Sequence, residues 1–194
     1  RPSRIGRYGR GVWHVTFRAY LTIDDSPSPQ TEELLDALIE RDIPALLFCR
    51  GDHLEKNPAP VVSAIRKGFV IGNHAWSHTR FHTLPHEKCM EEVEKTETLI
   101  NSVYKEAGVK RPGMYFRFPH MDRGAGGWII DYNACPDYRE ELVQMFSDGL
   151  NIHLEPRSQE LQDKKEKLQE YLKSLGFTAP FPEPPSFPWY TGTE

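Results

Sequence analysis

The sequence predicts an α/β domain whose strands run parallel. Apolar runs rich in β-branched and aromatic residues alternate with segments whose apolar residues repeat at helical spacing. One of these runs, residues 45–49, is wholly apolar, which is typical of a strand covered on both faces. Strands joined through helices pair in parallel, in an open sheet or a barrel. The chain has 194 residues, 38% of them hydrophobic and 27% charged, so we expect residues 1–194 to form a single domain.

The first strand and helix follow a basic, glycine-bearing lead-in at residues 1–11, which we expect to be flexible. Residues 12–23 are rich in β-branched and aromatic side chains and predict a strand that ends at a pair of aspartates. The next segment predicts a helix capped by Thr31. Four apolar residues recur there at helical spacing: Leu34, Leu35, Leu38 and Ile39.

The same alternation continues through the middle of the chain. Residues 61–67 predict a helix that Gly68 ends, and residues 69–71 predict a short strand. Residues 87–105 carry an apolar stripe on a densely charged segment, which predicts a long amphipathic helix. Residues 114–118 then predict a fourth strand.

The last third of the chain predicts helices without further strands. Residues 138–148 predict a short helix, and residues 158–175 predict a charged helix closed by Gly176. The proline-rich, aromatic tail at residues 180–194 is expected to be extended. A closed barrel needs more strand and helix units than these, so we expect the chain to end before its domain does.

Composition argues against several function classes. The net charge is −4, and no basic run is interleaved with aromatic residues, so we expect no nucleic-acid partner. No apolar stretch is long enough to span a bilayer. The three cysteines stand at wide spacing, which favours structural thiols over a disulfide framework or a thiolate metal site. The sequence determines neither the compartment nor the oligomeric state.

Five polar residues stand at the carboxyl ends of predicted strands: Asp24, Asp25, His74, His78 and Arg117. Ligands of parallel sheets and barrels gather at this edge. Two histidines and one carboxylate form a metal-ligand set, and the second carboxylate is free to act as a base. Neighbouring strand residues point to different sides, so we expect one aspartate to ligate and the other to accept a proton from water, held ionised by the arginine. The pattern indicates metal-dependent hydrolysis.

Two other interpretations of the histidines stay open. A histidine recurs at every fourth position from His74 to His86, which also fits a polar surface or capping face. Within that series we expect His82 and His86 to be structural, because Pro85 interrupts any helix that would align all four. The same ligand types also suit a ferrous oxygenase, although the additional aspartate favours hydrolysis. A metalloprotease motif is absent, since Ala75 stands where its glutamate would.

Three segments resemble the motifs of the NodB-homology polysaccharide deacetylases, the fourth carbohydrate esterase family. They are Thr22-Ile23-Asp24-Asp25-Ser26-Pro27, His74-Ala75-Trp76-Ser77-His78 and Arg117-Phe118-Pro119-His120, in the family's order and spacing. The resemblance covers residues 12–121. It implies an irregular (β/α) barrel that is incomplete at the C-terminus of this chain.

The resemblance also implies a role for each of five residues. Asp24 would be the catalytic base, with Arg117 orienting and tuning it. Asp25, His74 and His78 would bind a divalent metal ion. That ion would most often be Zn²⁺, with Co²⁺, Mn²⁺, Ni²⁺ or Fe²⁺ as alternatives.

The resemblance to the family is less complete for the substrate groove and the general acid. Pro119 and His120 would line the groove, with the backbone amide after the proline helping to hold the oxyanion. His120 stands where the family usually has an aromatic residue. The family's later motifs have only weak counterparts at residues 128–131 and 150–153. The general acid is therefore unidentified, and His153 is its weak candidate.

We expect a metal-dependent hydrolase that removes an acetyl group from an N-acetylated amino sugar or polysaccharide. The same site could instead deformylate, or hydrolyse another small C–N bond of, a non-sugar amide. An interpretation from a different class is a catalytically incomplete carbohydrate- or metal-binding domain. In that case Trp128, Trp189 and Tyr190 would serve as sugar platforms.

Overall fold

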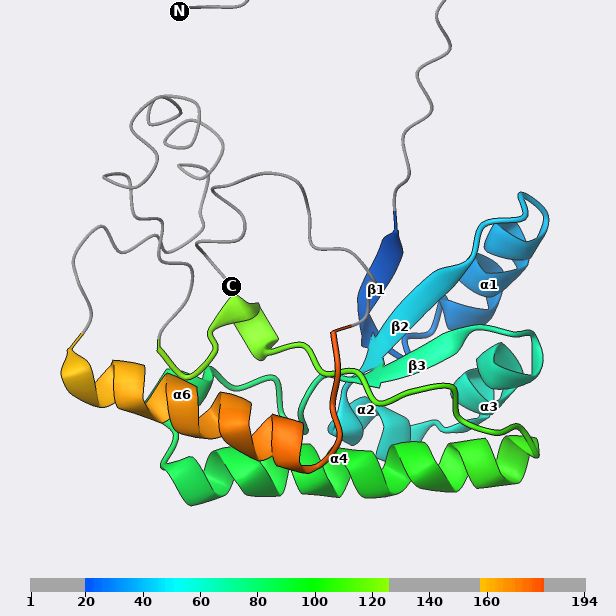
Figure 1. Cartoon of the computed structure of the whole chain (residues 1–194). Coiled ribbons are helices and arrows are strands. Elements are labelled where there is room, and N and C mark those ends of the chain that lie inside the picture. Colours follow the sequence, from blue (N-terminus) through cyan, green and yellow to red (C-terminus); the bar gives the residue numbers. More distant parts are fainter. Residues whose placement is uncertain (1–19, 126–157, 180–194) are drawn as a thin grey trace, which may run out of the picture.

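The computed structural model describes residues 20–125 and 158–179 (Figure 1). Three parallel strands form one sheet in the order β1-β2-β3. The strands are β1 Leu21–Ser26, β2 Ala45–Cys49 and β3 Val70–Asn73. The predicted α/β class is therefore confirmed. The described residues form an open sheet, and the barrel stays a prediction.

Five helices accompany the sheet within the described residues. They are α1 Thr31–Ile39, α2 Gly51–Lys56, α3 Ala59–Arg66, α4 His86–Ala107 and α6 Gln159–Ser174, with single 3-10 turns η1 Phe81–Thr83 and η2 Pro119–Met121. Figure 1 shows α4 running below the sheet and α6 lying along α4. The sequence did not predict α2, which is only six residues long.

Two buried apolar clusters hold these elements together. The larger one fills the space between the sheet and helices α1, α3 and α4, where Leu47, Ile71 and Ile100 are fully buried. The smaller one joins α6 to α4 and η1 through Val93 and Leu168. The second cluster therefore attaches residues 158–179 to the rest of the described fold.

The predicted helix ends agree with the structure at Gly68 and differ at Thr31. Gly68 follows α3 with φ of 93°, a left-handed conformation that glycine adopts without strain. The predicted cap of α1 is wrong, since Thr31 is the first helical residue and Gln30 precedes it without a side-chain cap bond. The Thr31 hydroxyl instead accepts a hydrogen bond from the backbone N–H of Ser28, at 2.7 Å.

The fourth predicted strand, residues 114–118, is wrong as a strand. It is reduced to one parallel bridge between Phe116 and Asn73, with two backbone hydrogen bonds of 2.8 and 3.0 Å. Prolines stand close on both sides of the segment, and they lack the backbone donor that a longer ladder needs. The short pairing still brings Arg117 beside the end of β3.

Several predictions fall outside the described residues. They concern the lead-in at 1–11, the short helix at 138–148, the tail at 180–194 and the motif counterparts at 128–131 and 150–153. Among the helices that the structure does describe, none has the length and hydropathy that crossing a membrane requires.

Candidate metal centre

The two aspartates lie at a bulge in β1. Between Ile23 and Ser26, β1 advances by three residues while β2 advances by two, so β1 carries one extra residue there. Asp25 has φ of 60°, in the left-handed region. A bulge re-aims side chains that a regular strand would send to opposite faces. Asp24 and Asp25 therefore both reach the same end of the sheet, which the simple alternation of strand side chains did not predict.

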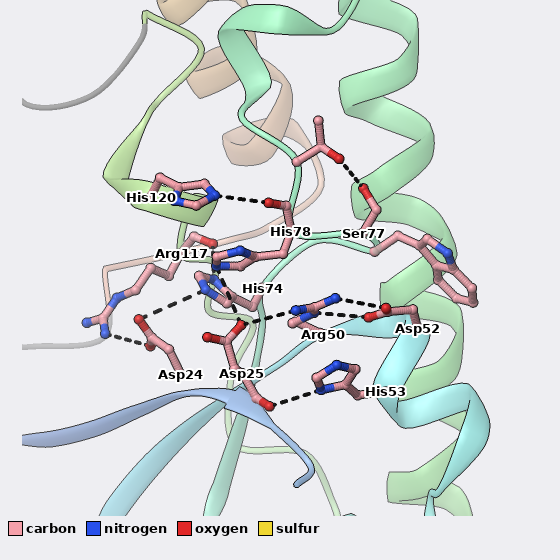
Figure 2. Close-up of polar contacts among 12 residues, drawn as sticks. Asp24, Asp25, Arg50, Asp52, His53, His74, Ser77, His78, Arg117 and His120 are labelled. Atoms are coloured by element: carbon pink, nitrogen blue, oxygen red, sulfur yellow. Dashed lines mark hydrogen bonds and ion pairs between the residues drawn. The ribbon is translucent and has the colours of Figure 1, made fainter. Parts of the chain in front are cut away.

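The two carboxylates face the two predicted histidines (Figure 2). Asp25 Oδ1 lies 3.5 Å from His78 Nε2, and Asp24 Oδ2 lies 4.0 Å from His74 Nε2. One ligand atom from each of Asp25, His74 and His78 lies within 4.8 Å of the others, the one such trio found among the described residues. Two atoms bound to one tetrahedral zinc ion at about 2.0–2.2 Å stand about 3.3–3.6 Å apart, so side-chain rotations that close the longest separation by about 1 Å let the three share an ion.

The surroundings of both histidines favour the neutral imidazole. His74 Nδ1–H donates to the backbone oxygen of Arg117 at 2.8 Å, which leaves Nε2 free to face the aspartates. Burial lowers the pKa of His74, although this hydrogen bond and the charges of Asp24 and Asp25 oppose it. Burial also lowers the pKa of His78, with Asp25 opposing. Both imidazoles therefore favour the neutral form that a metal ligand must have.

Asp24 is held by a different set of contacts. Arg117 Nη1 donates to Asp24 Oδ1 and to Thr22 Oγ1, each at 2.8 Å. The Arg117 guanidinium also stacks over the Phe48 ring, 4.4 Å from its centroid. These contacts fix the direction of the carboxylate that lies outside the trio. Asp24 therefore lies beside the candidate metal ligands with its carboxylate held by Arg117.

A third strand end contributes residues that the sequence analysis missed. Arg50, directly after β2, donates to both carboxylate oxygens of Asp52, at 3.0 and 2.8 Å. Its Nη1 lies 3.9 Å from Asp25 Oδ1, and His53 Nδ1 donates to the Asp25 backbone oxygen at 3.2 Å (Figure 2). The sequence could have indicated these residues, because β2 was predicted as a strand and the polar residues that follow it lie at the same sheet edge as those after β1.

The predicted groove residues lie beside His78. Pro119 and His120 belong to η2, and His120 has φ of 57°. His120 Nε2–H donates to the backbone oxygen of His78 at 3.2 Å, and the two rings are 4.4 Å apart (Figure 2). His120 is therefore exposed and in contact with one of the three candidate ligands.

The histidine series from His74 to His86 does not form one polar face. His74 and His78 meet Asp25, whereas His82 Nδ1 lies 2.7 Å from a carboxylate oxygen of the buried Asp122. The expectation that His82 is structural agrees with this contact. The weak acid candidate His153 and the aromatic residues Trp128, Trp189 and Tyr190 lie outside the described residues.

Fold and site together define a parallel α/β domain with a candidate metal centre of two histidines and one carboxylate. The family model for polysaccharide deacetylases matches residues 16–125, more than half of the chain. The chain belongs to the polysaccharide deacetylase family, as the three motifs in its sequence indicate.

Individual relatives are similar over shorter stretches. A chitooligosaccharide deacetylase of Rhizobium leguminosarum bv. trifolii is 31% identical over 97 residues, which is 50% of this chain and 45% of the relative. A peptidoglycan-N-acetylglucosamine deacetylase of Bacillus cereus is 34% identical over 82 residues, which is 42% of this chain and 30% of the relative. The chain thus spans less than half the length of these two relatives. Among solved structures, a family 4 carbohydrate esterase from Streptomyces lividans in complex with acetate superposes with a TM-score of 0.48 and 23% identity, covering 86% of this chain and 93% of that one.

Proposed function

We propose that this chain is a metal-dependent hydrolase that removes an acetyl group from an N-acetylated amino sugar of an oligo- or polysaccharide. The observation that carries the proposal is the meeting of Asp24 with the trio Asp25, His74 and His78 at one end of the sheet. The names of the relatives, a chitooligosaccharide deacetylase and a peptidoglycan-N-acetylglucosamine deacetylase, support an acetylated saccharide as substrate.

The donor set of the trio suits a transition metal, with Zn²⁺ the first choice and Co²⁺, Mn²⁺, Ni²⁺ or Fe²⁺ also compatible. When bound, such an ion polarises an acyl oxygen and makes water a better nucleophile. His74 and His78 supply neutral nitrogens for it, and Asp25 supplies one negative charge. With a divalent ion bound, the trio alone would carry one net positive charge, which would favour an electron-rich substrate oxygen.

Asp24 is the proposed catalytic base. It takes a proton from water as the water oxygen attacks the acyl carbon, and the C–N bond then breaks to give acetate and a free amine. Arg117 keeps the Asp24 carboxylate aimed at the centre. Pro119 and His120 line the groove, and the backbone amide of His120 is the proposed oxyanion donor.

The rest of the active site is also a proposal. The departing amine needs a proton, and we assign no donor for it among residues 20–125 and 158–179. We further propose that the described sheet is part of the irregular barrel that the sequence motifs imply. Support comes from the relatives, which are more than twice as long as the stretch that this chain covers.

The test is release of free amine from N-acetylglucosamine oligomers by the full 194-residue chain loaded with Zn²⁺. Asp24→Asn is the matched variant, because it keeps the size of the side chain but cannot accept the proton. We expect the variant to bind Zn²⁺ as the wild type does and to lose about 10²- to 10⁴-fold in rate. Equal rates would reject Asp24 as the base.

Two other outcomes would identify the alternatives. Metal binding without amine release from any acetylated saccharide would indicate a carbohydrate- or metal-binding domain. Release of amine from a formylated or acetylated non-sugar, but not from the oligomers, would indicate an amidase or deformylase with the same centre.

A further inference from the structure

The loop between the two histidine ligands is fastened at every backbone N–H. The N–H of Ala75 donates to Asn73 Oδ1 at 2.9 Å. Those of Trp76 and Ser77 both donate to Glu92 Oε2, at 2.9 and 2.7 Å. The Ser77 hydroxyl donates to the other oxygen of the same carboxylate, at 2.9 Å. Glu92 alone therefore accepts three hydrogen bonds from the five-residue segment that carries both candidate ligands.

The backbone of this loop is shaped to receive an anion. Ala75 has φ of 59°, and a left-handed residue turns successive N–H groups toward one side, where they form a concavity that binds negative charge. The Glu92 carboxylate occupies that position from helix α4. Figure 2 shows Ser77 on the side of the loop next to α4, with His74 and His78 on the side of the aspartates.

We propose that Glu92 is a positioning residue for the metal centre, setting the separation and direction of His74 and His78. The segment between them belongs to no helix or strand. Its carbonyl groups at Ala75 and Trp76 accept backbone N–H bonds from the first turn of α2, at 2.9 and 3.1 Å. The N–H groups of Trp76 and Ser77 are held by the half-buried carboxylate of Glu92 on α4, the longest described helix, which packs on the sheet. Groups that orient metal ligands in this way strongly affect metal affinity. The inference rests on the proposed metal centre and deepens it.

The test compares Zn²⁺ affinity in the full chain for the wild type, Glu92→Ala, Glu92→Gln, Glu92→Asp and Glu91→Ala. Glu91 is the matched control, since it is the preceding residue of α4 and its exposed side chain pairs only with Lys88 among the described contacts. We expect Glu92→Ala to weaken binding about 10- to 100-fold and Glu91→Ala to leave it unchanged. Equal affinities for the two alanine variants would overturn the proposal.

Two conservative variants test whether Glu92 acts through the placement of its hydrogen bonds or through its charge. The amide of Glu92→Gln keeps an oxygen for the two N–H donors and an NH₂ that donates to the Ser77 hydroxyl, so we expect binding near the wild-type value. Glu92→Asp keeps the charge but is one methylene too short, so we expect it to bind less tightly than Glu92→Gln. The reverse order would overturn the proposal, and this comparison decides the matter if Glu92→Ala fails to fold.

The outcome also separates this inference from the proposed function. If the wild type binds no Zn²⁺, the proposed centre fails and the role of Glu92 fails with it. If the wild type binds Zn²⁺ and all Glu92 variants bind it equally well, only the role of Glu92 is rejected.

Discussion

Asp24 depends on the side chain of Arg117, whereas His74 depends on the backbone of the same residue. The guanidinium fixes the Asp24 carboxylate, and the carbonyl oxygen fixes the His74 imidazole. One residue at the end of the bridge to β3 thus serves both the proposed base and a candidate ligand. A substitution of its side chain can separate the two roles.

We predict that Arg117→Met lowers the deacetylation rate without weakening metal binding. The variant removes the hydrogen bonds to Asp24 and Thr22 but keeps the carbonyl that orients His74. Misdirecting a reacting group by about 1 Å costs about 100-fold in rate, which is the loss we expect in kcat. A parallel loss of Zn²⁺ affinity would contradict this division of roles.

The lowered pKa values of the two histidines predict how metal binding depends on pH. Protons compete with the metal only below the pKa of the ligand, and burial lowers that pKa for both His74 and His78. We expect Zn²⁺ affinity, measured by competition with a chelator from pH 8 to 5, to hold through the ordinary histidine pKa of about 6.5 and to fall below it. Two histidines of ordinary pKa would lose about fourfold in affinity at pH 6.5, so a loss of that size at that pH would contradict the lowered values.

At the scale of single residues, the sequence predicted which polar side chains gather at the sheet edge because the strand ends were recognisable. Asp24, Asp25, His74, His78 and Arg117 were expected at one sheet edge, and the structure brings them together. The bulge could not be predicted, because the register of β1 depends on its pairing with β2. Glu92 was not singled out, because it is one of many charged residues on a segment that was predicted only as an amphipathic helix.

Among the elements, α4 contacts the sheet through a polar bond as well as through its apolar stripe. The Tyr104 hydroxyl accepts a buried hydrogen bond from the backbone N–H of Ile71 in β3, at 3.0 Å. The bond occupies an N–H on the side of β3 where the predicted fourth strand forms only one bridge. A helix side chain here supplies the hydrogen-bond acceptor that a backbone carbonyl of a neighbouring strand would otherwise supply.

We predict that Tyr104→Phe destabilises the fold by about 1–3 kcal/mol, because it leaves the buried N–H of Ile71 without an acceptor. Urea unfolding would measure the change. Tyr171→Phe is the matched control, since the Tyr171 hydroxyl donates to Glu94 at an exposed site where water replaces it. A Tyr104→Phe effect no larger than that of the control would contradict the role given to this bond.

The predicted helices and strands agree with the structure where the apolar periodicity was strong. They differ where strand pairing determines whether a segment becomes a strand. The long helix α4 and the buried strand β2 follow directly from their apolar patterns. The segment 114–118 has the composition of a strand, but its flanking prolines limit it to a bridge. The short helix α2 has too few residues for a periodic signal.

For the molecule as a whole, the candidate centre joins segments that are distant in the sequence. Asp25 comes from β1, and His74 and His78 follow β3, on the two sides of the central strand β2. An ion bound by all three would therefore connect the two outer strands of the described sheet. The parallel α/β class was predictable from the strand and helix alternation, whereas closure into a barrel was not testable on the described residues.

We predict that Zn²⁺ raises the thermal stability of the full chain. An ion that binds only the folded state stabilises it by about 2.7 kcal/mol when its free concentration is 100 times Kd. A calorimetric scan with and without Zn²⁺ measures the shift in Tm. An unchanged Tm in the presence of excess Zn²⁺ would contradict a centre assembled from separate strands.

The most direct test of the metal centre is an isothermal titration of the full chain with Zn²⁺. We predict one ion per chain for the wild type and no measurable binding for the double variant His74→Ala with His78→Ala. His53→Ala, which removes a neighbouring histidine outside the trio, should still bind one ion. Absence of binding by the wild type, or equal binding by the double variant, would contradict the central claim that Asp25, His74 and His78 share a cation.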